Sequence, residues 1–190
     1  GNPVVDRLLG AAGEPWAAAD FPDPSTLDAT HPPAETYCPL DADASQLAAV
    51  FAAAEGRSFV LQGPPGTGKS QTIANLIAHS LAQGRRVLFV AEKRAALEVV
   101  HRRLKSLGLD PFCLEVHSNK THKRDVVARL GNALDQVRVK EPARWAEEAA
   151  RLGELRAELN RLPELLHRER PAGLTFHQAV GRLVELGEGP

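Results

Sequence analysis

The chain has 190 residues, a formal net charge of −1, and 43% hydrophobic but only 5% aromatic residues. This length suits one domain with its own core and is short for two. No apolar run approaches roughly 18 residues and the start has no signal region, so the composition excludes a membrane-spanning protein and predicts no secretion. Cys38 and Cys113 lack metal-ligand spacing and indicate reduced thiols in a cytoplasmic protein.

Charge is distributed unevenly along the chain. Residues 1–55 hold nine acids and one base, whereas residues 85–140 hold thirteen Lys and Arg against six acids. Residues 141–190 hold nine acids and seven arginines. The basic middle indicates a local anionic partner, and a solvated helix face would have the same composition.

Residues 1–42 contain half of the fourteen prolines. Because proline breaks both helices and strand ladders, this stretch is predicted to be an extended lead-in or linker, held down by Trp16 and Phe21. Asp43 is a good N-cap for a helix over residues 44–55. Gln46 lies in the first turn of that helix, where its amide offers a donor and an acceptor to an adenine edge. An ordinary solvent-facing glutamine is the alternative.

The stretch GPPGTGKS, residues 63–70, fits the phosphate-binding pattern G-x-x-x-x-G-K-[ST]. Its glycines allow a tight backbone turn whose N–H groups form a nest for an anion, and a helix start adds its dipole. Lys69 is predicted to contact the β- and γ-phosphates as the catalytic residue, and the Ser70 hydroxyl to bind Mg²⁺. The predicted contacts to ATP are Gln46, Gly63, Pro64, Pro65, Gly66, Thr67, Gly68, Lys69, Ser70 and Gln71.

Apolar stretches alternate with amphipathic ones on both sides of this loop. Short apolar runs at residues 58–62, 86–91 and 111–117 predict strands, and the periodic stretches at 69–83 and 94–107 predict helices. This order predicts an α/β fold with right-handed crossovers and a parallel sheet.

Ligands of such a sheet lie beyond the carboxyl ends of the strands. Polar and basic residues follow two of the predicted strands at that rim, which suits contacts to a nucleic-acid backbone. These residues are Lys93, Arg94, Ser118, Asn119 and Lys120.

Two long helical patterns, residues 122–138 and 143–162, carry narrow apolar stripes. They predict an antiparallel pair joined near Pro142, with a dimerising coiled coil as the alternative. Pro163 is expected to kink or end the second helix. Thr175 and Gln178 form a capping-box pattern that opens a helix over residues 176–186.

Gln46, the loop GPPGTGKS, RVLFVAEKRAALEVV and FCLEVHSNK together resemble the first half of a superfamily 1 helicase of the Upf-like group. The nearest resemblance is to large bacterial proteins of unassigned function that carry this ATPase. It implies a RecA-like P-loop core, with Gln46 on adenine and residues 91–96 and 116–118 on the nucleic-acid backbone. The helical stretch 121–168 corresponds in position to the family's stalk and inserted subdomain.

Two departures from the family pattern stand out. Glu92 and Lys93 replace the usual proline and hydroxyl residue of the first backbone-contacting motif, so a hydroxyl contact is lost while Lys93 still offers a charge. No apolar strand ending in Asp-Glu follows the loop, so the acid that holds Mg²⁺ and orients the attacking water is missing. We therefore expect an incomplete sheet, a segment of a longer helicase, and no hydrolysis by the segment alone.

The expected organisation is a lead-in at residues 1–42, the first part of the RecA-like core at 43–120, a helical stalk at 121–170 and a further helical segment from 171. The expected function is that of an ATP-dependent motor acting on single-stranded DNA or RNA, completed by the remaining domains of the same chain. An AAA+ ATPase, whose loop sequence is the same, is one alternative. A nucleotide-controlled scaffold whose helix pair binds a protein is the other.

Overall fold

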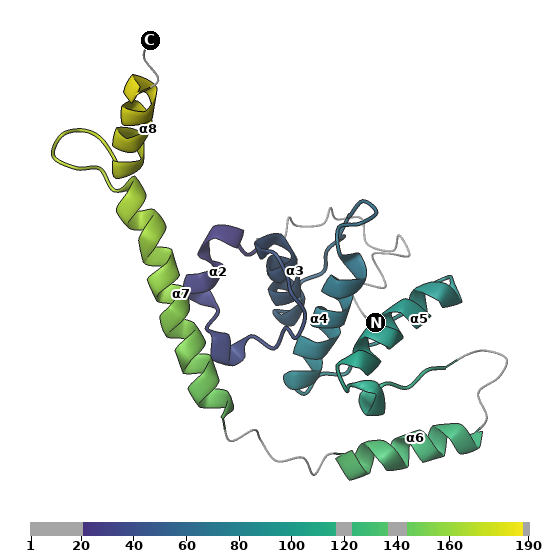
Figure 1. Cartoon of the computed structure of the whole chain (residues 1–190). Helices are drawn as coiled ribbons and strands as arrows, with labels where there is room; N and C mark the ends of the chain where they lie inside the picture. The colour runs from purple at the N-terminus through teal and green to yellow at the C-terminus, as the bar shows by residue number, and fades with distance from the viewer. Residues whose placement is uncertain (1–20, 117–122, 137–143, 188–190) are drawn as a thin grey trace, which may run out of the picture. The chain divides into compact units, whose positions relative to one another are not determined.

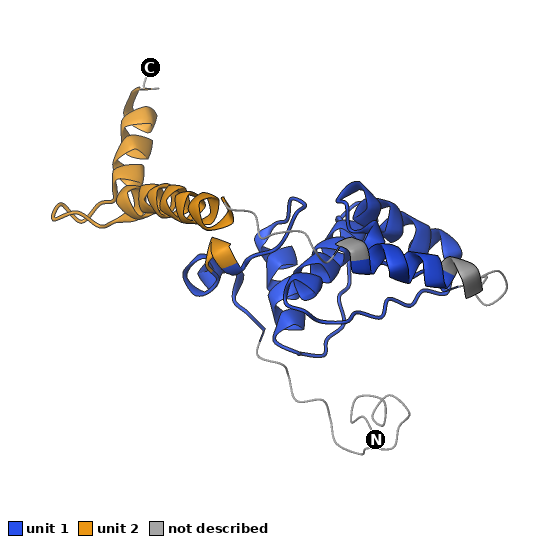
Figure 2. Ribbon diagram, turned by 90° about the horizontal axis from the view of Figure 1, so that it is seen from below, with its two compact units in different colours: residues 1–31, 35–141 blue, residues 32–34, 142–190 orange. Residues whose placement is uncertain are grey.

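The computed structural model describes residues 21–116, 123–136 and 144–187. The chain divides into two compact units, coloured separately in Figure 2. The first comprises Gly1–His31 and Glu35–Glu141, and the second Pro32–Ala34 and Pro142–Pro190. Each is described by itself.

The first unit is built on a row of helices (Figure 1). Helix α4 packs against α3 on one side and against α5 on the other. Single-turn 3-10 helices accompany them: η1 (Pro24–Thr26), η2 (Pro33–Glu35) at the boundary of the units, and η3 (Asp110–Phe112). The α-helices of this unit are α2 (Leu27–Thr30), α3 (Ala44–Ala54), α4 (Lys69–Ala82), α5 (Arg94–Ser106) and α6 (Lys123–Gln136).

Helix α3 begins at a capping box. The Asp43 carboxylate accepts from the Gln46 N–H, and the Gln46 side chain accepts from the Asp43 N–H, which satisfies two N–H groups at the helix start. Most of the helix is alanine, and Ala49 and Ala52 are fully buried. Small side chains allow α3 and α4 to pack closely, so the start of α3 lies beside the start of α4.

A second core lies between α4 and α5. Ala74 and Ile77 of α4 pack against Val100 and Leu104 of α5, and all four are buried. The helical periodicity predicted Ile77, Val100 and Leu104 as apolar positions, and Ala74 was not among them. The lead-in is anchored as well, because the ring of Phe21 packs edge-on against Phe59 at 5.1 Å between centroids; Trp16 lies outside the described residues.

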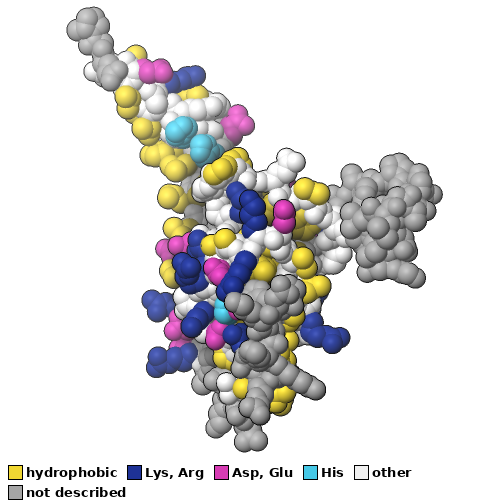
Figure 3. Space-filling view, turned by 90° about the vertical axis from the view of Figure 1, so that its right-hand side faces the viewer, with side chains coloured by type: hydrophobic (Ala, Val, Ile, Leu, Met, Phe, Trp, Pro, Cys, Tyr) yellow, Lys and Arg dark blue, Asp and Glu magenta, His cyan; other side chains and the backbone are white. Residues whose placement is uncertain are grey.

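The predicted parallel sheet is not confirmed. In the described residues the only β pairing is an isolated bridge between Glu169 and Thr175. The stretches 58–62, 86–91 and 113–116 have no assigned secondary structure, and residues 111 and 112 belong to η3. Several apolar side chains of these stretches are exposed, with Val60 at 85% and Leu88 at 87%, while Phe89 and Cys113 are partly buried against the core between α4 and α5. Figure 3 shows hydrophobic side chains (yellow) scattered over one face of the molecule. A strand is held by ladder bonds to a neighbour rather than by its own sequence, so an apolar run alone does not form one.

The second unit contains α7 (Trp145–His167) and α8 (Phe176–Gly187), which pack against each other. Pro163 lies inside α7 rather than ending it. The predicted capping box is confirmed: the Thr175 hydroxyl accepts from the Gln178 N–H at 3.1 Å, and the Gln178 amide oxygen accepts from the Thr175 N–H at 3.0 Å. No helix in the described part of the chain is long and apolar enough to cross a membrane.

Both helices of the predicted antiparallel pair are present. However, α6 belongs to the first unit and α7 to the second, and their predicted connection at Pro142 lies outside the described residues. The pairing of these two helices stays a prediction.

Candidate nucleotide-binding site

The loop over residues 63–70 turns through conformations that glycine favours. Gly66 and Gly68 have φ of 87° and 74°, in the left-handed region. The Thr67 hydroxyl donates to the Pro64 carbonyl at 2.9 Å and closes the loop on itself. Gly68 is the N-cap of α4, so the loop runs directly into a helix start, whose first-turn N–H groups lack intrahelical acceptors.

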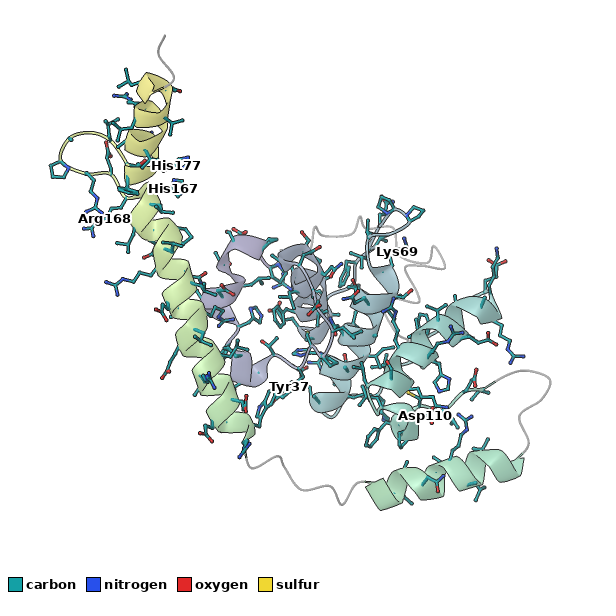
Figure 4. All side chains as sticks on the ribbon, viewed as in Figure 1. Tyr37, Lys69, Asp110, His167, Arg168 and His177 are labelled. Carbon is teal, nitrogen blue, oxygen red and sulfur yellow. The ribbon has the colours of Figure 1, made fainter. Side chains whose placement is uncertain are left out.

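Lys69 bends back over the loop that precedes it. Its ammonium donates to the carbonyls of Gly63 and Pro64, at 2.5 and 2.6 Å. Figure 4 shows Lys69 at the loop end of α4. An ammonium has three donors and no acceptor, so phosphate oxygens can take the place of these carbonyls with a small movement of one side chain.

Gln46 reaches this loop from the neighbouring helix. Its amide nitrogen donates to the Thr67 carbonyl at 3.0 Å, and its amide oxygen accepts from the Asp43 N–H at 3.2 Å. A Cβ added to Gly68 would lie 2.8 Å from that nitrogen, so the contact is close. The amide keeps one N–H and one oxygen lone pair, the set that recognises an adenine edge.

The model of the family described as "AAA domain" matches residues 41–163, which include Gln46, the loop and α4 through most of α7. The chain belongs to this family.

Curated relatives define the group within it. An uncharacterized ATP-dependent helicase, MG140, from Mycoplasma genitalium is 44% identical over 72 residues, or 38% of this chain and 6% of that protein. DNA-binding protein SMUBP-2 from Mesocricetus auratus is 32% identical over 139 residues, or 68% of this chain and 13% of that protein. The DNA polymerase alpha-associated DNA helicase A of Schizosaccharomyces pombe is 31% identical over 108 residues, or 54% and 16%.

These matches confirm the assignment to the superfamily 1 helicases of the Upf-like group. The family implies a P-loop NTPase fold and the use of a nucleotide. The chain spans only 6–16% of the length of these three relatives. No solved structure matches the chain.

Of the other residues predicted to contact the nucleotide, Ser70 lies at the start of α4 and Gln71 turns away to the lead-in. Ser70 follows Lys69 in the first turn of α4 and is half-buried. The Gln71 side chain turns to the lead-in, because its amide nitrogen donates to the Asp41 carbonyl at 2.5 Å. In the described residues no three His, Cys, Asp or Glu are grouped for a metal ion.

The predicted nucleic-acid rim is only partly described. Lys93 is the exposed N-cap of α5. Arg94 forms an ion pair with Glu98 one turn later, at 2.8 Å. An exposed pair of this kind is weak, so the arginine remains available to a phosphate. Ser118, Asn119 and Lys120 lie outside the described residues.

Neither Cys38 nor Cys113 is in a disulfide. Burial raises the pKa of Cys38 to about 11. Burial and the nearby Asp110 carboxylate raise the pKa of Cys113. Because the thiolate is the nucleophile, these groups do not serve thiol catalysis at neutral pH.

Sequence reasoning missed a polar row on the inner face of α4. Gln71, Asn75 and His79 follow one another at intervals of four and bind the backbone of residues 37–41, here called the strap. The signal was present, because polar side chains recur every four residues along one face of this helix. The strap shows that the end of the lead-in is docked on α4.

His79 is buried at the far end of this row. Its Nδ1 accepts from the Tyr37 N–H at 3.2 Å, which requires that nitrogen to be unprotonated. Burial, followed by the charges of Arg85 and His31, lowers the pKa of His79 below its ordinary value of 6.5. The folded chain therefore favours neutral His79.

This shift predicts acid sensitivity. The unfolded chain binds the proton more readily, so the contribution of His79 is complete above pH 6.5 and declines as the pH falls below it. We expect the melting temperature to fall as the pH is lowered below 6.5, and the fall to be smaller in His79→Asn. As a control, the exposed His177→Asn should show the same fall of melting temperature with pH as the wild type. If His79→Asn also showed the wild-type fall, His79 would not be the source of the acid sensitivity.

Proposed function

We propose that the loop over residues 63–70 binds ATP with Mg²⁺, and that the chain is the ATP-binding part of an ATP-dependent DNA or RNA helicase or translocase of the cytoplasm. The observation that carries the proposal is the convergence of Gln46, the loop and Lys69 at the start of α4. This arrangement brings the Gln46 amide, which suits a base, next to the loop N–H groups and the Lys69 ammonium, which suit phosphates.

Each residue has a physical role in this proposal. The N–H groups at the start of α4 receive phosphate oxygens, and Lys69 moves from the loop carbonyls to the β- and γ-phosphates. The Ser70 hydroxyl binds Mg²⁺, which neutralises the charge that develops on the phosphates. Gln46 selects adenine with its remaining donor and acceptor. Phosphoryl transfer needs mainly positioning and charge stabilisation, so these contacts account for most of what the site must supply.

Hydrolysis requires a further acid. The sequence contains no apolar strand ending in Asp-Glu after the loop, so we propose that the longer helicase supplies this acid and a second motor domain. Closure on ATP and reopening after hydrolysis would then move the protein along one strand. In this account the chain alone binds nucleotide weakly and hydrolyses little of it.

Titration calorimetry with ATP and Mg²⁺ tests the proposal. We expect ATP to bind saturably in a one-to-one ratio, and we expect added ADP to reduce this binding. Heat that never saturates, or binding that ADP does not reduce, would contradict an ATP site.

We propose that the rim basic residues contact the nucleic-acid backbone. Replacing Lys93, Arg94 and Lys120 together by alanine should flatten the salt dependence of single-strand binding, because each phosphate contact releases counterions. The slope of log affinity against log salt, measured by fluorescence anisotropy, should fall by about 2 for three contacts on a single strand. An unchanged slope would mean that these residues are solvated and do not contact the nucleic acid.

One observation favours a second function. The apolar stripe of α7 is exposed, with Leu159 at 70% and Leu152 at 57%. A scaffold that binds a protein under nucleotide control would use such a stripe. Salt-dependent binding of single-stranded DNA or RNA supports the motor, and nucleotide-linked binding of a protein alone supports the scaffold. The AAA+ alternative is not favoured, because the MG140 and helicase A relatives are named helicases.

A further inference from the structure

We propose that Asn75 is a positioning residue for base recognition, because it clamps the strap to α4 and thereby fixes Gln46 beside the loop. This inference rests on the proposed nucleotide site and adds residues that do not touch the nucleotide. It predicts that the specificity for adenine depends on the buried Asn75 amide, which bonds the strap.

Asn75 holds the strap by two bonds. Its amide oxygen accepts from the Leu40 N–H and its amide nitrogen donates to the Leu40 carbonyl, both at 2.9 Å. The side chain has no exposed surface. A primary amide that closes a ring on one backbone residue replaces the pair of bonds that a neighbouring strand would make. Loss of this side chain would leave a backbone donor and acceptor without partners.

Two flanking contacts extend the clamp along the helix. Nearer the loop, Gln71 donates to the Asp41 carbonyl, and at the far end His79 accepts from the Tyr37 N–H. Figure 4 shows Tyr37 well along α4 from Lys69. The strap therefore follows one face of the phosphate-loop helix, from its far half toward its start.

The clamp leads directly to Gln46. Two residues after Asp41, Asp43 caps α3, and its N–H and carboxylate fix the side chain and backbone of Gln46. Gln46 then donates to the Thr67 carbonyl. Two residues of backbone join Asp41 to Asp43, and hydrogen bonds form the other links, so holding Asp41 on α4 restrains the Gln46 amide relative to the loop. Such preorganisation strengthens binding by reducing the ordering that the ligand must impose.

The clamp should affect the base more than the phosphates. The loop N–H groups and Lys69 belong to α4 and its own N-terminal loop, so they do not need the strap. Gln46 belongs to α3 and does need it. Releasing the strap is therefore expected to weaken ATP binding while leaving the binding of tripolyphosphate, which has no base, nearly unchanged.

The test compares these two ligands. In Asn75→Ala we expect the affinity for ATP with Mg²⁺ to fall about tenfold and that for tripolyphosphate to change less than about twofold. Ser80→Ala is the matched control, since Ser80 is buried on the same helix and makes none of the strap bonds. It should change neither affinity. An equal loss for both ligands in Asn75→Ala would overturn the proposal.

A double variant separates positioning from general damage. If Asn75 acts through Gln46, adding Asn75→Ala to Gln46→Ala should not weaken ATP binding further. Additive losses would contradict the proposal. Circular dichroism shows whether Asn75→Ala folds. If it does not, Gln71→Asn is the second variant, because the shorter side chain no longer reaches the Asp41 carbonyl. This variant should also lose affinity for ATP, but less than Asn75→Ala. A wild-type chain that binds tripolyphosphate but does not prefer ATP would overturn this inference alone, and one that binds neither ligand would overturn the proposed function.

Discussion

Lys69→Ala is expected to reduce the affinity for ATP with Mg²⁺ by at least about a hundredfold. The ammonium is the positive side chain that reaches into the loop, where it donates to the Gly63 and Pro64 carbonyls. Each hydrogen bond to a charged group contributes about 1.5–3 kcal/mol, and the contacts to two phosphates would be lost together. Titration calorimetry measures the change.

Lys105→Ala is the control for Lys69→Ala. It also removes one exposed lysine from a helix of the first unit, near the end of α5 and away from the loop. It should leave the affinity for ATP within about twofold of wild type. If the Lys69→Ala variant and the wild type bound ATP with equal affinity, Lys69 would not be a phosphate-binding residue.

Gly68→Ala should abolish saturable ATP binding and destabilise the fold. Gly68 has φ of 74°, where a Cβ costs about 1–2 kcal/mol, and that Cβ would lie 2.8 Å from the Gln46 amide nitrogen. The substitution therefore strains the loop and displaces Gln46. Calorimetry reports the binding, and chemical denaturation reports the free energy of unfolding.

Gly108→Ala separates these two effects. Gly108 also has φ of 74°, but its Cβ would meet no atom within 4 Å. The variant should lose a similar free energy of unfolding, about 1–2 kcal/mol, and keep its affinity for ATP. If Gly108→Ala lost ATP binding to the same extent, the loss in Gly68→Ala would reflect stability rather than the site.

The parts that could be predicted from sequence are those fixed by near neighbours in the chain. The loop glycines, the helix that begins at Lys69 and the capping boxes at Asp43 and Thr175 each depend on residues within about one turn. The observed helices begin and end close to the predicted residues. The contact of Gln46 with the loop, across 21 residues, was not predicted, because the sequence and the family resemblance indicated only that its amide reads adenine.

The strand predictions that were not confirmed and the strap contacts that were not predicted both depend on residues far apart in the sequence. A run such as residues 86–91 is apolar and β-branched, yet it forms no ladder in the described residues, because pairing requires a neighbouring strand. The strap was predicted only as part of a proline-rich lead-in. Its docking through Asn75 and His79 spans 35 and 42 residues, a distance over which composition carries no information about contacts.

The central claim is that the backbone of the loop receives the phosphates of ATP, and amide chemical shifts test it most directly. In a titration of the isotopically labelled chain with ATP and Mg²⁺, the amide resonances of Gly66, Gly68, Lys69 and Ser70 should shift together and saturate. Tripolyphosphate should reproduce those shifts, while the Gln46 side-chain amide should respond to ATP alone. Loop resonances that do not move at saturating ATP would contradict the account.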